Sequence, residues 1–192
     1  MAPAYDWIFG LSFAAGRRAA IAAVDLQAGE RVLEVGVGTG LSLRRWPRNT
    51  EVVGIDLSPH MLERAERAKA RRGLHHVHLH LMDAQATTFP DNHFDAVAAM
   101  YVASVVPDLD ALLAEMRRVC RPNGRIVIVN HFSKTGPMRW LERATERYAG
   151  LMGFNPSLSL SHVTNSPGLR VQSVAPVNLG GYWTLVCAEN IK

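Results

Sequence analysis

Three glycines and three carboxylates in the first half of the chain have the types and spacing that could bind a nucleotide-like ligand. The stretch 32–40, VLEVGVGTG, passes from an apolar, β-branched run into the glycines. This pattern is typical of a strand that enters a tight turn and then a helix. Glycines in such a turn allow positive φ and let backbone N–H groups approach a ligand. The residues concerned are Gly36, Gly38, Gly40 and the carboxylate Glu34.

The other two carboxylates, Asp56 and Asp83, lie where later strands are expected to end. Asp56 stands 20 residues beyond Gly36, the spacing at which an acid can accept hydrogen bonds from both ribose hydroxyls. Either aspartate could instead only cap a helix. A dinucleotide is disfavoured because GVGTG does not complete GxGxxG: the third glycine would have to stand at Leu41.

The elements that must position these residues alternate between strand-like and helix-like runs over the first two thirds of the chain. Apolar strands are expected at 32–35, 51–55, 76–81, 94–100 and 126–129, and a closing hairpin at 171–176 and 182–188. Helices are expected at 1–16, 17–26, 41–46, 59–72 and 109–119, and from residue 137 onward. The alternation predicts an α/β fold with a doubly wound, mostly parallel sheet and a C-terminal antiparallel hairpin. Such sheets bind ligands at the carboxyl ends of their strands.

Length and composition are those of one globular domain, residues 1–192. The net charge of +4 and the pI near 9.4 hint at anionic partners. Cys120 and Cys187 lie far apart without metal spacing, so we expect reduced thiols and a cytoplasmic location.

Residues 1–16 are almost entirely apolar and are followed at once by Arg17 and Arg18. This short helix could pack on the domain as a lid, or could lie in a lipid headgroup layer with the arginines near phosphates. This stretch alone does not decide between the two interpretations. It is too short to span a bilayer.

Three histidines alternate along the third expected strand: His76, His78 and His80. They share one face of that strand. The face could bind a metal, but the neighbouring sequence offers no further ligands in a closed arrangement, so solvent-facing histidines on an edge strand are the simpler interpretation. We predict no metal site.

Four segments, in order and spacing, resemble the motif set of class I S-adenosylmethionine-dependent methyltransferases. They are VLEVGVGTG, VVGIDLSPHML, MDAQATTFPDNHFDAV and EMRRVCRPNGRIVIV, and together they span residues 30–130. The resemblance implies a Rossmann-like, seven-stranded sheet with helices on both faces, and S-adenosyl-L-methionine as cofactor.

Carried over by position, the family pattern assigns cofactor contacts to particular residues. It places the three glycines against the methionine part, with Glu34 fixing the turn or meeting the methionine ammonium through water. It predicts that Asp56 binds the ribose and that Leu57 packs on the adenine face. It also predicts that Asp83 and the Ala84 backbone contact the adenine amino edge. Tyr101, at the end of the fourth strand, completes the expected cofactor site.

The N-terminal YDWIFGLSFAAGRR and the chain's size are similar to one branch of the class, the bacterial phosphatidylethanolamine N-methyltransferases. This similarity implies methylation of phosphatidylethanolamine and its methylated intermediates to phosphatidylcholine. It implies a phospholipid substrate, an N-terminal helix on an anionic membrane surface, and a monomer that is peripheral on the inner face of the cell membrane.

The alternative enzyme methylates a soluble small molecule or quinone precursor. A cofactor-binding regulator or RNA-binding module is disfavoured, because aromatic and basic residues do not interleave as nucleic acid binding requires; we expect no nucleic acid partner.

Methylation of an amine requires a neutral nitrogen in line with the methyl group and an environment that steadies the passing positive charge. Tyr5 in the expected lid and Tyr101 are candidates, through cation–π or hydroxyl contacts, although each could be an ordinary core aromatic. Partners for a substrate phosphate are expected in the loops after the fifth strand and in the following helix. The candidates are His131, Lys134, Arg139 and His162. His131 could instead be the base that removes an ammonium proton.

Overall fold

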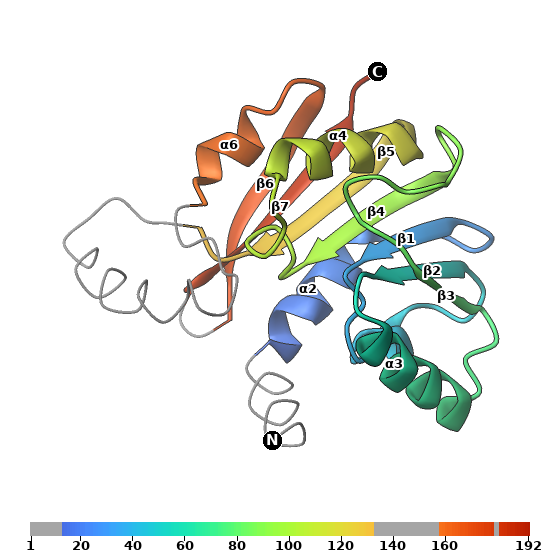
Figure 1. The fold of residues 1–192 in the computed structure, drawn as a ribbon. Helices are drawn as coiled ribbons and strands as arrows, with labels where there is room; N and C mark the ends of the chain where they lie inside the picture. Colours follow the sequence, from blue (N-terminus) through green and yellow to red (C-terminus); the bar gives the residue numbers. More distant parts are fainter. Residues whose placement is uncertain (1–12, 133–157, 179–180) are drawn as a thin grey trace.

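The protein, seen in a computed structural model, is built on one seven-stranded sheet with helices on both faces (Figure 1). The structure describes residues 13–132, 158–178 and 181–192. The strands are β1 (Arg31–Val35), β2 (Glu51–Asp56), β3 (Val77–Leu81), β4 (Phe94–Met100), β5 (Cys120–Asn130), β6 (Leu169–Val177) and β7 (Trp183–Asn190). Their order in the sheet is β3-β2-β1-β4-β5-β7-β6.

The first five strands pair in parallel, and β7 pairs antiparallel to both β5 and β6. This confirms the predicted doubly wound sheet and its C-terminal antiparallel hairpin. The order reverses between β1 and β4, so the carboxyl ends of these two neighbouring strands form the crevice where such sheets bind ligands.

Helices cover both faces of the sheet (Figure 1). The helices are α2 (Ala14–Val24), α3 (Pro59–Arg72), α4 (Leu109–Val119) and α6 (Leu160–Thr164), with a 3-10 turn η1 (Leu43–Arg45). In Figure 1, α2 and α3 lie below the sheet and α4 and α6 above it. Strand residues alternate between the two cores: Leu33 and Val35 pack with α4, whereas Val32 packs on the side of α2 and α3.

Helix ends follow the expected chemistry. Ser58 caps α3 by accepting the Met61 N–H at 3.4 Å, and Pro59 occupies the first helical position. Asp108 caps α4 by accepting the Ala111 N–H at 3.0 Å. Capping by these residues fixes where each helix leaves the carboxyl edge of the sheet.

Two expected helices differ in the structure. The sequence predicts a break between two helices after residue 16, but residues 14–16 belong to α2. The helix continues because nothing between Gly16 and Arg17 stops it. The helix expected over 41–46 is only the turn η1, since Pro47 closes it after one turn.

Two expected loops also contain regular structure. The turn predicted at 121–124 is a bulge inside β5, where the register with β4 shifts between Phe94 and Ala96 and Asn123 has φ of 58°. The loop predicted over 153–167 contains the short helix α6 in its described part. The helix expected from residue 137 lies outside the described residues.

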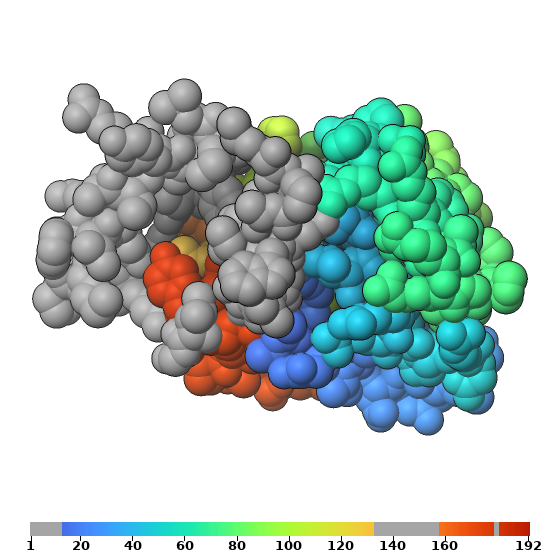
Figure 2. Space-filling model, turned by 90° about the horizontal axis from the view of Figure 1, so that it is seen from below, coloured from blue at the N-terminus to red at the C-terminus, as the bar shows by residue number. Residues whose placement is uncertain are grey.

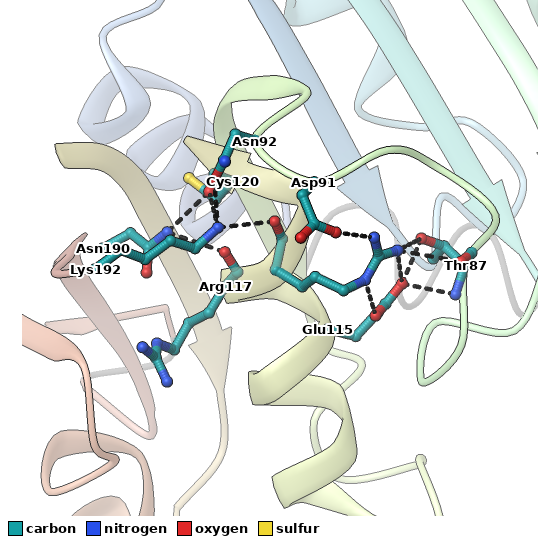
Figure 3. A network of polar contacts seen from close by, with 9 residues as sticks. Thr87, Asp91, Asn92, Glu115, Arg117, Cys120, Asn190 and Lys192 are labelled. Carbon is teal, nitrogen blue, oxygen red and sulfur yellow. Dashed lines mark hydrogen bonds and ion pairs between the residues drawn. The ribbon is translucent and has the colours of Figure 1, made fainter. Parts of the chain in front are cut away.

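A polar network at the amino ends of the parallel strands locks the C-terminus onto α4 and β5 (Figure 3). Asn190 Nδ2 donates to the carbonyls of Arg117 at 2.9 Å and Cys120 at 2.8 Å. Lys192 Nζ donates to the carbonyl of Arg118 at 2.9 Å. The buried Cys120 is a free thiol, and burial raises its pKa to about 12, so it stays protonated. The network at this end of the sheet stabilises the fold, and the candidate site lies at the opposite, carboxyl ends of the parallel strands.

Among the described residues, no helix has the length and apolar character needed to cross a membrane.

Candidate active site

A cavity of about 710 Å³ opens at the carboxyl ends of the parallel strands. Its walls come from the glycine loop after β1, the ends of β2 and β4, the loop after β3, and the start of α2. Most of the predicted cofactor residues line it: Glu34, Gly36, Gly38, Asp56, Leu57, Asp83, Ala84 and Tyr101. Four separate segments of the chain therefore meet at one cavity.

The glycine loop needs its glycines for different reasons. Gly36 has φ of 67°, and a Cβ there would come within 2.2 Å of Val102 Cγ2. Gly38 has φ of 56° and nothing within 4 Å of the position of a Cβ, so its missing side chain leaves open space in the cavity wall. Gly40 does not line the cavity; a Cβ there would meet Ala65 Cα of α3 at 3.2 Å. Gly40 thus permits the loop to pack on α3.

Glu34 supports the loop from below. Its side chain is only 3% exposed, and it accepts hydrogen bonds from Trp46 Nε1 at 2.6 Å and from Ser42 Oγ. Burial raises the pKa of Glu34, while the two hydrogen bonds and the charge of Arg17 act in the opposite direction. Glu34 therefore ties the glycine loop to the segment that follows it, which agrees with the expectation that it fixes the turn.

Asp56 ends β2 and holds two backbone N–H groups. Its Oδ2 accepts from the N–H of Gly38 at 2.8 Å, and its Oδ1 accepts from the N–H of Ser58 at 2.9 Å. Each carboxylate oxygen can accept more than one hydrogen bond, so both retain capacity for ligand hydroxyls. Leu57 follows with 68% of its surface exposed. An exposed leucine beside an anchored carboxylate offers an apolar face next to a hydroxyl acceptor.

Asp83 lies across the cavity in the loop after β3. Its Oδ1 accepts from the N–H of Gln85 at 2.9 Å, which leaves Oδ2 without a partner among the described residues. Gln85 also lines the cavity, and its Oε1 accepts the N–H of Asp108 at 2.8 Å. This loop presents acceptors to the ligand and is linked to the cap of α4.

Tyr101 is held in a strained conformation at the end of β4. Its φ is 67°, which is rare for an aromatic residue and is often found at functional sites. Its Oη donates to the carbonyl of Phe13 at 3.1 Å and accepts from Asn178 Nδ2 at 2.7 Å. A Cβ at Gly16 would come within 2.2 Å of that oxygen, so Gly16 allows the approach. Burial raises the pKa of the phenol, opposed by Asn178 and Arg17, so Tyr101 is neutral at physiological pH.

An aromatic wall surrounds Tyr101, and we define it as Phe13, Tyr101 and Trp183. Their ring centroids lie 4.6 Å (Phe13 to Tyr101), 4.8 Å (Phe13 to Trp183) and 4.9 Å (Tyr101 to Trp183) apart. All three line the cavity. The Arg17 guanidinium lies 5.7 Å from the Tyr101 ring centroid, which shows that this ring accepts a cation at its face.

Phe13 and Trp183 were not predicted as site residues. Trp183 reads as an ordinary residue of a hairpin strand, and Phe13 as one of several apolar residues in the N-terminal segment. Only the folding together of the two chain ends, through α2 and β7, shows that they flank Tyr101. The adjacent Tyr182 and Trp183 are the one signal in the sequence that could have indicated an aromatic site there.

The predicted residues for the substrate side are dispersed. His131 is not part of the cavity lining; its ring stacks on Tyr182 at 4.1 Å, and its Nδ1 lies 3.1 Å from the carbonyl of Tyr182. His162, on α6, pairs with Asp110 of α4 at 2.7 Å, which does not favour phosphate binding there. Tyr5, Lys134 and Arg139 lie outside the described residues, and their roles stay predictions.

The histidines of the third strand are on the edge of the sheet, since β3 pairs only with β2. His78 and His80 are exposed, and His76 is partly buried, which lowers its pKa. The described residues contain no group of three or more metal-binding side chains.

Comparison with known proteins assigns the family. The family model for a methyltransferase domain matches residues 33–128. A phosphatidylethanolamine N-methyltransferase of Cereibacter sphaeroides is 42% identical over 184 residues, which cover 95% of this chain and 90% of that protein. The chain belongs to the S-adenosylmethionine-dependent methyltransferases. The methyltransferase is also 40% identical to a demethylmenaquinone methyltransferase of Thermus thermophilus, over 67% of this chain and 61% of that protein. A solved geranyl diphosphate methyltransferase in complex with the cofactor shares the fold, with a TM-score of 0.77, 18% identity, and coverage of 92% of this chain and 84% of that one.

The cavity of the methyltransferase fits S-adenosylmethionine. The open space beside Gly38 leaves room for a ligand against the backbone, and a side chain there would fill it. Asp56 and Asp83 are acceptors suited to hydroxyl and amino groups, and the exposed Leu57 offers an apolar face suited to a planar base.

Proposed function

We propose that this methyltransferase transfers methyl groups from S-adenosylmethionine to the amine of phosphatidylethanolamine and of its mono- and dimethylated forms. The observation that carries the proposal is the 42% identity to a phosphatidylethanolamine N-methyltransferase over 95% of the chain. That similarity extends beyond the cofactor motifs into the chain's two ends. These ends contribute Phe13 and Trp183 to the aromatic wall.

In this proposal the strand-end residues hold the cofactor. Asp56 accepts the ribose hydroxyls while it keeps the N–H of Gly38 in place, Leu57 packs on the adenine, and Asp83 with Ala84 reads the adenine edge. Glu34 shapes the glycine loop through its hydrogen bonds from Ser42 and Trp46. Bound S-adenosylmethionine supplies an electrophilic methyl group on its sulfonium.

The aromatic wall would receive the amine. Aromatic faces attract a cation, and the attraction is worth about 0.5–2 kcal/mol depending on desolvation. The acceptor nitrogen becomes positively charged as its bond to the methyl group forms, so faces of Tyr101 and Trp183 stabilise the transition state more than the neutral amine. Because its hydroxyl donates to Phe13 and its pKa is raised, Tyr101 acts by its ring and orientation and does not take a proton.

The proton of the substrate ammonium needs a separate acceptor. His131 follows β5, and its ring centroid lies 5.9 Å from that of Trp183. Its assignment as base or phosphate partner stays a proposal. We also propose, from the sequence of residues 1–12, that the N-terminus binds the membrane surface, with the protein a monomer on the inner face of the cell membrane.

Product analysis tests this function. The protein is incubated with methyl-labelled S-adenosylmethionine and vesicles that contain phosphatidylethanolamine, and the extracted lipids are separated. We expect label in mono-, di- and trimethylated lipid. An unlabelled lipid fraction, with cofactor binding intact by calorimetry, would contradict the proposal.

Deletion of residues 1–12 tests the membrane contact. The deletion stops before Phe13, because this residue packs on Tyr101 and Trp183. We expect the shortened protein to bind cofactor and to sediment with phosphatidylethanolamine vesicles much less than the full chain does. Full retention of sedimentation would place the membrane contact elsewhere.

A second candidate is methylation of a quinone precursor, favoured by the 40% identity to a demethylmenaquinone methyltransferase. That similarity covers 67% of the chain. It is tested by supplying a demethylated quinol in place of the phospholipid.

A further inference from the structure

A second pocket, of about 320 Å³, lies on the other side of the glycine loop, between η1 and α3. Thr39, Gly40 and Leu41 line one side, and Ala68 of α3 contributes to the other. Five arginines complete the lining: Arg44, Arg64, Arg67, Arg71 and Arg72. We call this the arginine pocket.

Three of the five arginines in the pocket have no carboxylate partner among the described residues. Arg67 pairs with Glu63 one helical turn away, on the exposed surface of α3. Arg44, Arg71 and Arg72 form no ion pair with any described residue. The guanidinium groups of Arg44, Arg71 and Arg72 therefore line one small space without a carboxylate partner among the described residues, an arrangement that stabilises a bound anion.

The end of α3 does not explain these arginines. Cations near a helix C-terminus offset the macrodipole and can hydrogen-bond its last carbonyls. Here Arg48, from the segment before β2, already donates to the carbonyls of Arg72 at 3.3 Å and Gly73 at 3.2 Å. The carbonyl of Lys69 accepts the N–H of Leu74 at 3.2 Å. The side chains of Arg71 and Arg72 are thus available to a ligand.

The cationic surface continues from the pocket toward α2. Burial is the main cause of the lowered pKa of Arg45 in η1, and the charges of Arg44 and of Arg18 in α2 lower it further. Figure 2 views the molecule from this side, where the segment of residues 40–70, in light blue to green, lies beside α2 in dark blue. The pocket and α2 share one face of the protein.

We propose that the arginine pocket binds the phosphate of an anionic phospholipid headgroup and thereby seats this face on the membrane. Guanidinium forks match pairs of phosphate oxygens, so several arginines around one small space suit a phosphodiester. Leu41, 39% exposed at the rim, is an apolar contact for the lipid beyond its phosphate. The proposal rests on the proposed action at a bilayer, which brings such lipids to this face.

A nucleic acid fits the pocket less well. Single-stranded nucleic acid is bound by a basic groove in which aromatic side chains stack on bases. The residues that line the arginine pocket include no aromatic side chain.

The pocket also contacts the cofactor loop. Thr39 and Leu41 line both the arginine pocket and the 710 Å³ cavity. A headgroup held on one side would restrict the loop that binds the cofactor on the other. Coupling of this kind is reciprocal, so anionic lipid should tighten cofactor binding and cofactor should tighten lipid binding.

The test compares two double variants with the same change in charge. Arg44→Gln/Arg71→Gln removes two pocket arginines that form no ion pair with the described part of the chain. The control, Arg121→Gln/Arg170→Gln, removes two exposed arginines from β5 and β6. Sedimentation is measured with vesicles of phosphatidylethanolamine that do or do not contain phosphatidylglycerol. Affinity for S-adenosylhomocysteine is measured by calorimetry with each vesicle type and with inorganic phosphate.

We expect the pocket variant to lose about 10- to 30-fold in affinity for the anionic vesicles, and the control to lose less than about threefold. Only the wild type and the control should bind S-adenosylhomocysteine more tightly when phosphatidylglycerol is present. Equal losses in both variants would overturn the proposal, because net charge alone would then explain binding. Inorganic phosphate that reproduces the whole effect would show a site for free phosphate. Competition by a homopolymer RNA that depends on Arg44 and Arg71 would show a nucleic acid site; either result would overturn it.

The outcome is separate from that of the proposed function. Methylation of phosphatidylethanolamine in vesicles without anionic lipid would uphold the proposed function even if the arginine pocket bound nothing. Tight, pocket-dependent binding to phosphatidylglycerol without any lipid methylation would uphold the pocket and refute the function.

Discussion

Replacement of Gly36 or Gly38 by alanine should separate the stability of the glycine loop from its role in binding. Both residues have positive φ, 67° and 56°, so alanine at either position costs about 1–2 kcal/mol in backbone strain. Only the Gly36 Cβ meets an atom of the core, Val102 Cγ2 at 2.2 Å. Overpacking of this kind adds about 1–3 kcal/mol. Gly36→Ala should therefore lower the free energy of unfolding by about 2–5 kcal/mol, and Gly38→Ala by about 1–2 kcal/mol.

Urea unfolding followed by circular dichroism measures this difference. Val102→Ala removes the methyl group that the new Cβ would strike, so a double-mutant cycle isolates the clash. We expect Gly36→Ala and Val102→Ala to couple favourably by about 1–3 kcal/mol. Additive effects, or equal losses for the two glycine variants, would refute the packing argument.

For cofactor affinity, in contrast to stability, Gly38→Ala should have the larger effect of the two substitutions. The Gly38 Cβ would enter space that the structure leaves open in the cavity wall. Gly38→Ala should stay folded at 25 °C and yet bind S-adenosylhomocysteine at least about tenfold more weakly, a loss of about 1.4 kcal/mol. Unchanged affinity by calorimetry would mean that the cofactor does not approach this part of the loop.

Three further predictions concern other residues. Asp56→Asn should weaken S-adenosylhomocysteine binding by about 1–3 kcal/mol in calorimetry, because the ribose loses its charged acceptor, whereas the exposed Asp110→Asn should not; equal affinities would remove Asp56 from the site. Trp183→Leu should lower kcat for lipid methylation by about 2- to 30-fold with little change in cofactor affinity, and Trp183→Phe should lower it less, since a ring face remains; identical rates for the two variants would argue against a cation–π role. Burial works to raise the pKa of Glu115, but hydrogen bonds from Arg118 and Thr87 outweigh it and hold the pKa below its usual range. The ionised Glu115 thus stabilises the fold above about pH 4.3, and this stability is lost as the pH falls through the folded-state pKa. The difference in unfolding free energy between wild type and Glu115→Gln should be constant from pH 6 to 8 and shrink below about pH 4; a difference that persists in acid would contradict it.

The cofactor half of the site could be predicted because its determinants are local. A glycine loop after a strand, and acids at the ends of the next two strands, are set by short segments whose positions the parallel sheet then brings together. Asp56 shows this well: its spacing from the loop indicated the ribose role, and the structure adds that it also holds the Gly38 N–H. Gly40 shows the limit, since its spacing matched the motif but its contact is with α3.

The substrate half could not be predicted in the same way. Trp183 reaches the site only because β7 inserts antiparallel beside β5, and Phe13 only because α2 packs across β4, β5 and β7. These are contacts between residues far apart in the chain, and no local pattern encodes them. The arginine pocket was hidden for a related reason: the basic end of α3 resembles a solvated helix terminus until Arg48 is seen to occupy the carbonyls.

The most direct test of the proposed function is a competition between two acceptors in one vesicle preparation. Vesicles contain phosphatidylethanolamine and a demethylated quinol in equal amounts, methyl-labelled S-adenosylmethionine is limiting, and the label in each product is counted. We predict that the label enters phosphatidylethanolamine and its methylated forms, and that Trp183→Leu lowers this incorporation. Label in the quinol, with none in the phospholipid, would contradict the account and assign the aromatic wall to a different substrate.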